Sequence, residues 1–171
     1  MENKIAKKEK TETETEKWFK NNIEEKFKIT ARVKQIILVI AQEEAKRLKY
    51  DYLEPEHIFL ALIEEGEKNL AVQALLKMKI VLKTIKSEIE KRLFKNILTK
   101  TSDVPFSSNS KKVIDFAIEE AKSMGLNYIG TEHLLLGLIK EKESLTAKVL
   151  LEFGVTFEKT KIEINRLYKK E

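Results

Sequence analysis

The chain has 171 residues, of which 42% are hydrophobic and 36% are charged, and its formal net charge is +5. Because acidic and basic residues alternate along the chain, they indicate solvated helix faces rather than a nucleic-acid-binding surface. The absence of cysteine excludes disulfide bonds, thiolate metal ligands and thiol catalysis. No apolar run approaches the roughly 20 residues that span a bilayer. From the charge pattern we expect no nucleic acid as a partner, and from the lack of such an apolar run we expect no membrane. With 5 glycines and 2 prolines, few tight turns are available and a mostly helical chain is favoured.

The first 26 residues contain seven lysines and seven glutamates, and no apolar periodicity precedes Trp18. Such a segment cannot bury enough apolar surface to offset the entropy of ordering it. We therefore predict that residues 1–26 form a charged, flexible N-terminal extension, with Trp18 and Phe19 as a weakly docked anchor. The alternative is a flank with no structural role.

Residues 27–98 carry the apolar spacing of four helices. The predicted helices cover approximately 33–48, 55–65, 70–78 and 82–97. Pro55 occupies the position of a first helical residue, and Gly66 ends the second helix. The polar stretch 99–105, which ends in proline, predicts a linker.

The same order of motifs recurs in residues 106–171. At an offset of 76, residues 43–63 align with 119–139, and ten of these 21 positions are identical. After one deletion the offset becomes 75, a pattern that indicates a tandem duplication. Because a repeat of about 70 residues has little core of its own, we predict an all-α fold in which two four-helix repeats pack as one pseudo-two-fold domain.

The residue types that catalysis requires do not gather in this sequence. His57 and His133 stand at equivalent repeat positions instead of together, and the glycines form no phosphate-binding loop. Without a recognisable nucleophile, base and orienting group, we expect a protein that is not an enzyme and that binds no cofactor itself. For both histidines, packing is a commoner role than ligation, so no metal site is predicted.

Two motifs of each repeat resemble the Clp N-terminal repeat. One motif is Leu-Glu-Pro-Glu-His-Ile-Phe-Leu-Ala-Leu-Ile at 53–63 and Ile-Gly-Thr-Glu-His-Leu-Leu-Leu-Gly-Leu-Ile at 129–139. The other is Ala-Gln-Glu-Glu-Ala at 41–45 and Ala-Ile-Glu-Glu-Ala at 117–121. From about residue 30 to 169, the chain is most similar to the double-repeat N-terminal domain of ClpC-type AAA+ unfoldases, with ClpA and ClpB types as relatives.

The resemblance implies a non-catalytic recognition domain that receives unfolded or marked protein substrates and adaptor proteins. In that family, AAA+ modules that bind ATP follow the domain and, in ClpC and ClpA types, feed substrates to the ClpP peptidase. We expect the N-terminal part of such an unfoldase, because the chain ends near the family's domain boundary. The alternative is a stand-alone accessory subunit that docks on the Clp protease core. A bacterial chain would be cytoplasmic, and a eukaryotic one would work in a plastid or apicoplast stroma.

The resemblance also implies a ligand. The domain of Gram-positive ClpC reads phosphoarginine, with one site in each repeat around the glutamate that corresponds to Glu56 or Glu132. A carboxylate suits the guanidinium group of that ligand, and helix N-terminal N–H groups suit its phosphate. A purely structural role is the alternative, because the helix dipole favours a glutamate in a first turn in any case.

The two candidate sites differ in their flanking residues. In the second repeat, Ser107 follows an aromatic residue and Thr131 precedes the glutamate, as in the family pattern. A gapless alignment puts Thr30–Ala31 at the aromatic–hydroxyl positions of the first repeat, where Pro55 replaces the threonine and has no N–H for an anion. We therefore predict that, if phosphoarginine binds, the site of Glu132, Thr131 and Ser107 is the better one.

Overall fold

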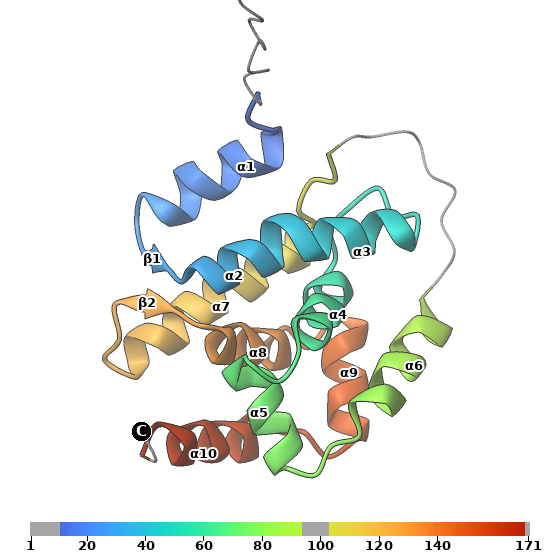
Figure 1. The fold of residues 1–171 in the computed structure, drawn as a ribbon, viewed down its shortest axis with the longest axis vertical. Helices are drawn as coiled ribbons and strands as arrows, with labels where there is room; N and C mark the ends of the chain where they lie inside the picture. Colours follow the sequence, from blue (N-terminus) through green and yellow to red (C-terminus); the bar gives the residue numbers. More distant parts are fainter. Residues whose placement is uncertain (1–10, 94–102, 170–171) are drawn as a thin grey trace, which may run out of the picture.

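The computed structural model describes residues 11–93 and 103–169, and helices form nearly all of their regular structure (Figure 1). Before the repeats lie helix α1 (Glu14–Phe19) and the π-helical turn η1 (Lys20–Glu24). The first repeat contains β1 (Lys28–Ile29), α2 (Ala31–Gln35), the π-helical turn η2 (Ile36–Ile40), α3 (Ala41–Arg47), α4 (Pro55–Glu65), α5 (Leu70–Lys77) and α6 (Leu82–Arg92). The second contains α7 (Ser108–Ser123), β2 (Tyr128–Ile129), α8 (Thr131–Lys140), α9 (Leu145–Glu152) and α10 (Phe157–Tyr168). None of the helices in the described ranges is long and apolar enough to cross a membrane.

Short polar side chains begin most of these helices. Those that accept a hydrogen bond from a backbone N–H of the first turn belong to Thr13, Thr30, Asn69, Ser107, Ser144 and Thr156. Helix α4 begins instead with Pro55, whose missing N–H is no loss at a first helical position. Because a helix cannot satisfy its own first N–H groups, these caps fix where each helix starts.

The two repeats meet through two short parallel contacts between extended segments. Strand β1 pairs with β2, and the N–H of Thr30 donates to the carbonyl of Ile129 (3.2 Å). Leu53 pairs with Phe106 in the same parallel sense, and the N–H of Ser107 donates to the carbonyl of Leu53 (3.1 Å). The two contacts are equivalent, because an operation that exchanges the two repeats superposes one contact on the other. This is the pseudo-two-fold relation that the duplication predicts.

Each repeat packs its fourth helix on the third helix of the other repeat. Helix α6 lies against α9 and α10 lies against α5, as Figure 1 shows. Arg92 of α6 makes a bidentate ion pair with Glu152 of α9, at 2.9 and 2.8 Å. The helix predicted over 82–97 is described to Arg92, and its last residues lie outside the described ranges. Since neither repeat closes its own core, the two form one unit, and the predicted all-α double repeat is confirmed.

One more residue separates the cap from the Glu-Glu pair in the first repeat than in the second. Thr30 caps α2 through the N–H of Val33, as Ser107 caps α7 through the N–H of Ser110. The extra residue falls in η2, whose wider turn absorbs a one-residue insertion without breaking the helix. The gapless alignment is therefore wrong by one position. Thr30, and not Ala31, is the equivalent of Ser107, so both repeats have the hydroxyl cap.

The charged N-terminal segment is helical in its described part and packs on the second repeat. Phe19 is fully buried and Ile23 nearly so, one helical turn apart. The ring of Phe19 stacks on that of Phe106, with centroids 6.2 Å apart. The predicted flexibility of residues 1–26 is therefore wrong for α1 and η1, whereas the predicted anchor Phe19 is indeed docked, in the core. Residues 1–10 lie outside the described ranges.

Helix α1 also reaches the connection between the repeats. The N–H of Thr15 donates to the carboxylate of Asp103 (2.9 Å), and its hydroxyl donates to the carbonyl of Val104 (3.2 Å). Gln42 of α3 makes two further hydrogen bonds with the backbone of Val104, at 2.7 and 3.1 Å. The end of the predicted linker 99–105 is thus fixed to the core, while its earlier part lies outside the described residues.

Candidate functional site

The cap of α7 lies beside the loop that leads into α4 of the other repeat. Ser107 donates its N–H to Leu53, and its side chain hydrogen-bonds the carboxylate of Glu54. Glu56 follows two residues later, in the first turn of α4. The predicted site residues Ser107 and Glu56 therefore belong to the same end of the molecule, although they come from different repeats.

The cap of α2 lies beside the equivalent loop of the second repeat. Thr30 is hydrogen-bonded to Ile129, and Thr131 and Glu132 open α8 directly after this contact. Ser107 makes no contact with either of these two residues. It begins the 16-residue helix α7, about 24 Å long, whereas the loop that leads to Glu132 leaves the other end of α7 (Figure 1). The structure therefore does not assemble the predicted site of Ser107, Thr131 and Glu132.

Glu56 is buried, and its carboxylate caps a helix of the other repeat. The Oε1 atom accepts a hydrogen bond from the N–H of Thr146 (2.9 Å), in the first turn of α9. A carboxylate is favourable there because it meets the positive end of the helix dipole and an N–H that the helix leaves unpaired. The buried hydroxyl of Thr146 has no hydrogen-bond partner among the described residues. The first candidate carboxylate thus joins the two repeats.

Glu132 is the repeat equivalent of Glu56, yet it contacts a different helix. The phenol of Tyr168, near the end of α10, donates a short hydrogen bond to Oε1, and the hydroxyl of Thr131 lies 3.4 Å from Oε2. Burial raises the pKa of Tyr168, as does the Glu132 carboxylate, so the phenol remains a donor. Glu132 is 2% exposed. Tyr168 thus covers the second candidate carboxylate.

The residue before each glutamate accounts for this divergence. In the second repeat, the hydroxyl of Thr131 accepts a hydrogen bond from the N–H of Ala71 (3.4 Å), in the first turn of α5. This contact is the equivalent of the one that Glu56 makes with α9. Pro55 stands at the position of Thr131 and has no hydroxyl, so in the first repeat the glutamate supplies the acceptor.

Sequence reasoning missed Glu54, which stands where the second repeat has Gly130. The carboxylate of Glu132 folds back over Gly130, and a β-carbon there would lie 2.7 Å from its Cδ atom. The first repeat accommodates a side chain at this position because Glu56 points away toward α9. Glu54 is partly buried, and although its hydrogen bond to Ser107 opposes the effect, burial raises its pKa. The Glu-for-Gly exchange between the aligned repeats was the available signal.

The two histidines hold the loops that precede α4 and α8. The Nδ1 atom of His57 accepts a hydrogen bond from the N–H of Glu54, and that of His133 accepts one from the N–H of Gly130, both at 2.9 Å. Burial lowers the pKa of His57 to about 4 and also lowers that of His133, so both rings are neutral near pH 7. No group of three or more His, Cys, Asp or Glu side chains in the described ranges could hold a metal ion.

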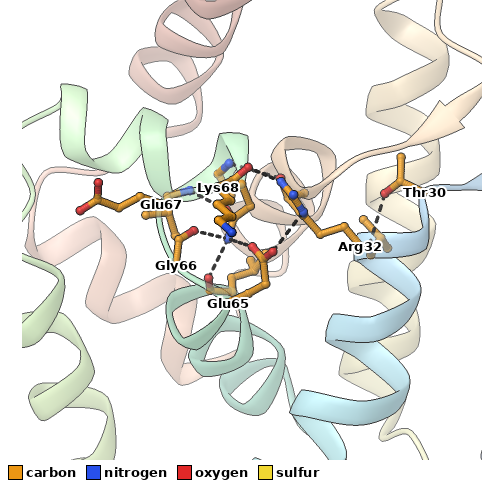
Figure 2. A network of polar contacts seen from close by, with 12 residues as sticks. Thr30, Arg32, Glu65, Gly66, Glu67 and Lys68 are labelled. Atoms are coloured by element: carbon orange, nitrogen blue, oxygen red, sulfur yellow. Dashed lines mark hydrogen bonds and ion pairs between the residues drawn. The ribbon is translucent and has the colours of Figure 1, made fainter.

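A polar network ties the start of α2 to the first repeat's second and third helices. Arg32 makes an ion pair with Glu65 at the end of α4 (3.0 Å) and a short hydrogen bond to the carbonyl of Lys68 (Figure 2). The other carboxylate oxygen of Glu65 accepts a hydrogen bond from Asn69, the cap of α5 (2.7 Å). Arg32 lies two residues after Thr30, whose N–H contacts Ile129 in the loop before α8.

Both ends therefore offer a carboxylate beside a helix start, an arrangement that can hold a cation on the carboxylate and an anion on N–H groups. In each case the carboxylate already has a partner, so a ligand must replace it. At Glu56 that partner is a backbone N–H of a buried helical turn. At Glu132 it is the phenol of Tyr168, near the end of α10.

Comparison with protein-family models gives a match to the Clp repeat (R) N-terminal domain over residues 28–170, which excludes α1. A ClpA homologue of Cyanidium caldarium, named as an ATP-binding subunit of the ATP-dependent Clp protease, is 40% identical over 148 residues. The match covers 86% of this chain and 17% of that protein. The chloroplastic chaperone ClpC1 of Oryza sativa subsp. japonica is 37% identical over 131 residues, which are 77% of this chain and 14% of that protein. This chain thus spans less than a fifth of these relatives.

Solved structures show the same fold at lower sequence identity. The N-terminal domain of ClpD from Arabidopsis thaliana superposes with a TM-score of 0.63 at 24% identity and covers 86% of this chain and 97% of that one. The Hsp104 N-terminal domain from Candida albicans superposes with a TM-score of 0.69 at 18% identity and covers 84% of this chain and 93% of that one.

Proposed function

Because the chain belongs to the Clp repeat N-terminal domain family, we propose that it receives substrate proteins and adaptor proteins for an ATP-dependent Clp unfoldase. The observation that carries this proposal is the interleaved double repeat, whose two halves place equivalent helix starts at two ends of one unit. Such a unit is suited to binding and orienting another protein. ATP hydrolysis and contact with the ClpP peptidase are assigned to other modules of the parent protein.

As one class of substrate we propose proteins that carry phosphoarginine, with Glu132 receiving the guanidinium group. The support is that Tyr168 is a replaceable side-chain partner, whereas Glu56 is held by the N–H of Thr146 inside α9. Thr131 retains an N–H at the start of α8, which Pro55 lacks in the first repeat. The second repeat is therefore still the better site, although Ser107 is not part of it.

The experiment is a calorimetric titration of phosphoarginine into the 171-residue chain and into the variants Glu132→Gln and Glu56→Gln. Saturable binding should be lost in Glu132→Gln and retained in Glu56→Gln, while free arginine and inorganic phosphate serve as controls. Equal loss in both variants would contradict the assignment to Glu132. No heat at millimolar ligand would remove phosphoarginine from the proposal and leave protein recognition to be tested separately.

Protein recognition is tested with a fluorescently labelled protein kept permanently unfolded by reduction and alkylation. Its fluorescence anisotropy should rise saturably with this chain, and the same protein in its folded state should give no rise. Several relatives are named as chloroplast proteins, so we propose a plastid stroma as the compartment, with the cytoplasm if the chain is bacterial.

A further inference from the structure

A groove lies between the end of α8, the exposed face of α9 and the first turn of α10, with a volume of about 610 Å³. We call it the α9 groove. Its apolar surface includes Ile139 of α8, Leu151 of α9 and Phe157 of α10. Leu151 is 63% exposed, although it follows directly after the fully buried Leu150. Single exposed leucines are common on proteins, but this one stands in a hollow whose other walls are also apolar.

Positive charge surrounds this apolar surface. Lys140 and Lys161 lie 3.1 and 2.8 Å from the carboxylate of Glu120. Burial favours a raised pKa for Glu120, but the hydrogen bonds from Lys161 and Lys140 outweigh it and keep the pKa below its usual range. Glu120 is therefore ionised, and the charges of Lys140 and Lys161 balance its charge. It does not offset the charge of further lysines at the groove.

Two lysines at the groove lack such a partner. Lys142 and Lys148 line it, and neither makes an ion pair with any carboxylate in the described part of the chain. The ammonium group of Lys148 donates only to the backbone carbonyl of Glu143 (3.0 Å). Glu158 also lines the groove, but no ion pair in the described part of the chain joins it to Lys142 or Lys148. The groove thus combines an apolar floor with ammonium groups that make no ion pair, which favours a ligand that carries carboxylates beside apolar groups.

The first repeat shows that the basic rim is not a requirement of the fold. Leu76 is the equivalent of Leu151 and is also exposed, at 39%. At the equivalent positions, however, Glu64 replaces Lys140 and Gln73 replaces Lys148. The same helical frame therefore folds with an acidic and a neutral residue at these places, so the fold does not require lysines there.

We propose that the α9 groove docks a segment of a partner protein in which apolar side chains are flanked by aspartate or glutamate. The apolar side chains would cover Leu151, and the carboxylates would pair with Lys142 and Lys148. The proposal rests on the proposed receiving function and names the chemistry of one class of adaptor or substrate segment. It places this segment on the second repeat and not on its equivalent in the first.

The test is fluorescence anisotropy with a labelled peptide of leucine and phenylalanine flanked on both sides by glutamates. A peptide with the same apolar centre flanked by lysines is the control for charge. Leu151→Ser should weaken binding of the acidic peptide about tenfold, because it removes most of the apolar contact. Lys148→Gln should weaken it roughly two- to fivefold and reduce its dependence on salt.

The first repeat provides matched variants, Leu76→Ser for the apolar contact and Lys83→Gln for the loss of one exposed lysine. Both should leave peptide binding unchanged, and all four substitutions are at surface positions, so thermal unfolding should remain cooperative. If Leu76→Ser weakens binding as much as Leu151→Ser, or if the lysine-flanked peptide binds as tightly, the α9 groove is not the docking site.

The outcome for the unfolded protein separates this proposal from the function on which it rests. If the unfolded protein binds but the Leu151→Ser and Lys148→Gln substitutions leave peptide binding unchanged, the receiving function stands and the α9 groove is rejected. Should neither the unfolded protein nor any peptide bind the parent chain, the receiving function is rejected together with the groove.

Discussion

The two repeats share the hydroxyl caps of their first helices, their buried histidines and their strand contacts, but they hold the facing third helix through different groups. In the first repeat the carboxylate of Glu56 holds α9, and in the second the hydroxyl of Thr131 holds α5. Because Thr131 supplies the acceptor in the second repeat, the carboxylate of Glu132 accepts a hydrogen bond from Tyr168 instead. The comparison teaches that, after a duplication, the residue before a glutamate can decide which helix its carboxylate contacts.

The largest expected effect on the free energy of unfolding concerns His57, and it tests whether His57 and His133 lie in similar environments. Burial lowers the pKa of His57 to about 4 from its ordinary 6.5. Because the folded chain binds this proton less readily than the unfolded chain, the contribution of His57 to stability is complete above pH 6.5, is lost progressively between pH 6.5 and 4, and changes no further below pH 4. The loss for His57 should be about 3 kcal/mol, measured by urea unfolding at a series of pH values.

The matched variant is His57→Asn, whose side-chain oxygen can still accept the N–H of Glu54 but does not titrate. It should flatten the pH profile of the free energy of unfolding between pH 6.5 and 4. His133→Asn is its counterpart in the second repeat, where the pKa is lowered as well. A profile for His57→Asn with the same slope as that of the parent chain would show that His57 is protonated as easily in the folded state as in the unfolded one.

The next effect tests the unequal roles of the glutamates. Glu56→Ala leaves the buried N–H of Thr146 without an acceptor and should lower the free energy of unfolding by about 2 kcal/mol. Glu132→Ala should lower it by only about 1 kcal/mol, because Thr131 still serves the N–H of Ala71. Chemical denaturation of both variants measures the difference, and equal losses would mean that the two carboxylates have the same structural role.

A smaller effect concerns the glycine beneath Glu132. Gly130→Ala forces the carboxylate of Glu132 to move and should lower the free energy of unfolding by about 1 kcal/mol. In Glu132→Ala the same glycine substitution should have almost no further effect, because the overlapping group is gone. Denaturation of the double variant measures this coupling. Strictly additive losses would place the carboxylate away from Gly130.

The smallest effect compares the turns that follow α5 and α9. Lys79 has a φ of 61° where the second repeat has Gly154 with a φ of 76°. Because a β-carbon is unfavourable in this left-handed region, Lys79→Gly should raise the free energy of unfolding by about 0.5 kcal/mol, and Gly154→Ala should lower it by about 1 kcal/mol. Thermal unfolding checks both signs, and a loss of stability in Lys79→Gly would contradict the expected strain.

Much of the fold could be predicted because its signals are local or repeated. Pro55, Gly66 and the recurring apolar residues predict the second helix at the place where α4 is found. The insertion at η2 could not be predicted, because Ile36–Ile40 is apolar throughout and either register presents an apolar face. Helix α1 could not be predicted, because charged residues dominate its sequence. The contacts that bury Phe19 and Ile23 come from residues that are distant in the sequence.

The candidate site was predictable residue by residue but not in its grouping. Glu56, Thr131 and Glu132 stand out in the aligned repeats, and each is found at a helix start. Which of them meet depends on strand contacts between the repeats, and sequence order within one repeat carries no information about these contacts. Ser107 was for this reason assigned to the wrong glutamate.

The exchanged fourth helices have a consequence for synthesis on the ribosome. Helix α10, which closes over α5, ends at Tyr168, so the apolar face of the first half stays uncovered until almost the whole domain has emerged. At typical rates of about 5 to 20 residues per second, that interval lasts several seconds. Throughout it the nascent chain exposes apolar surface, as do the unfolded proteins that we propose it later receives.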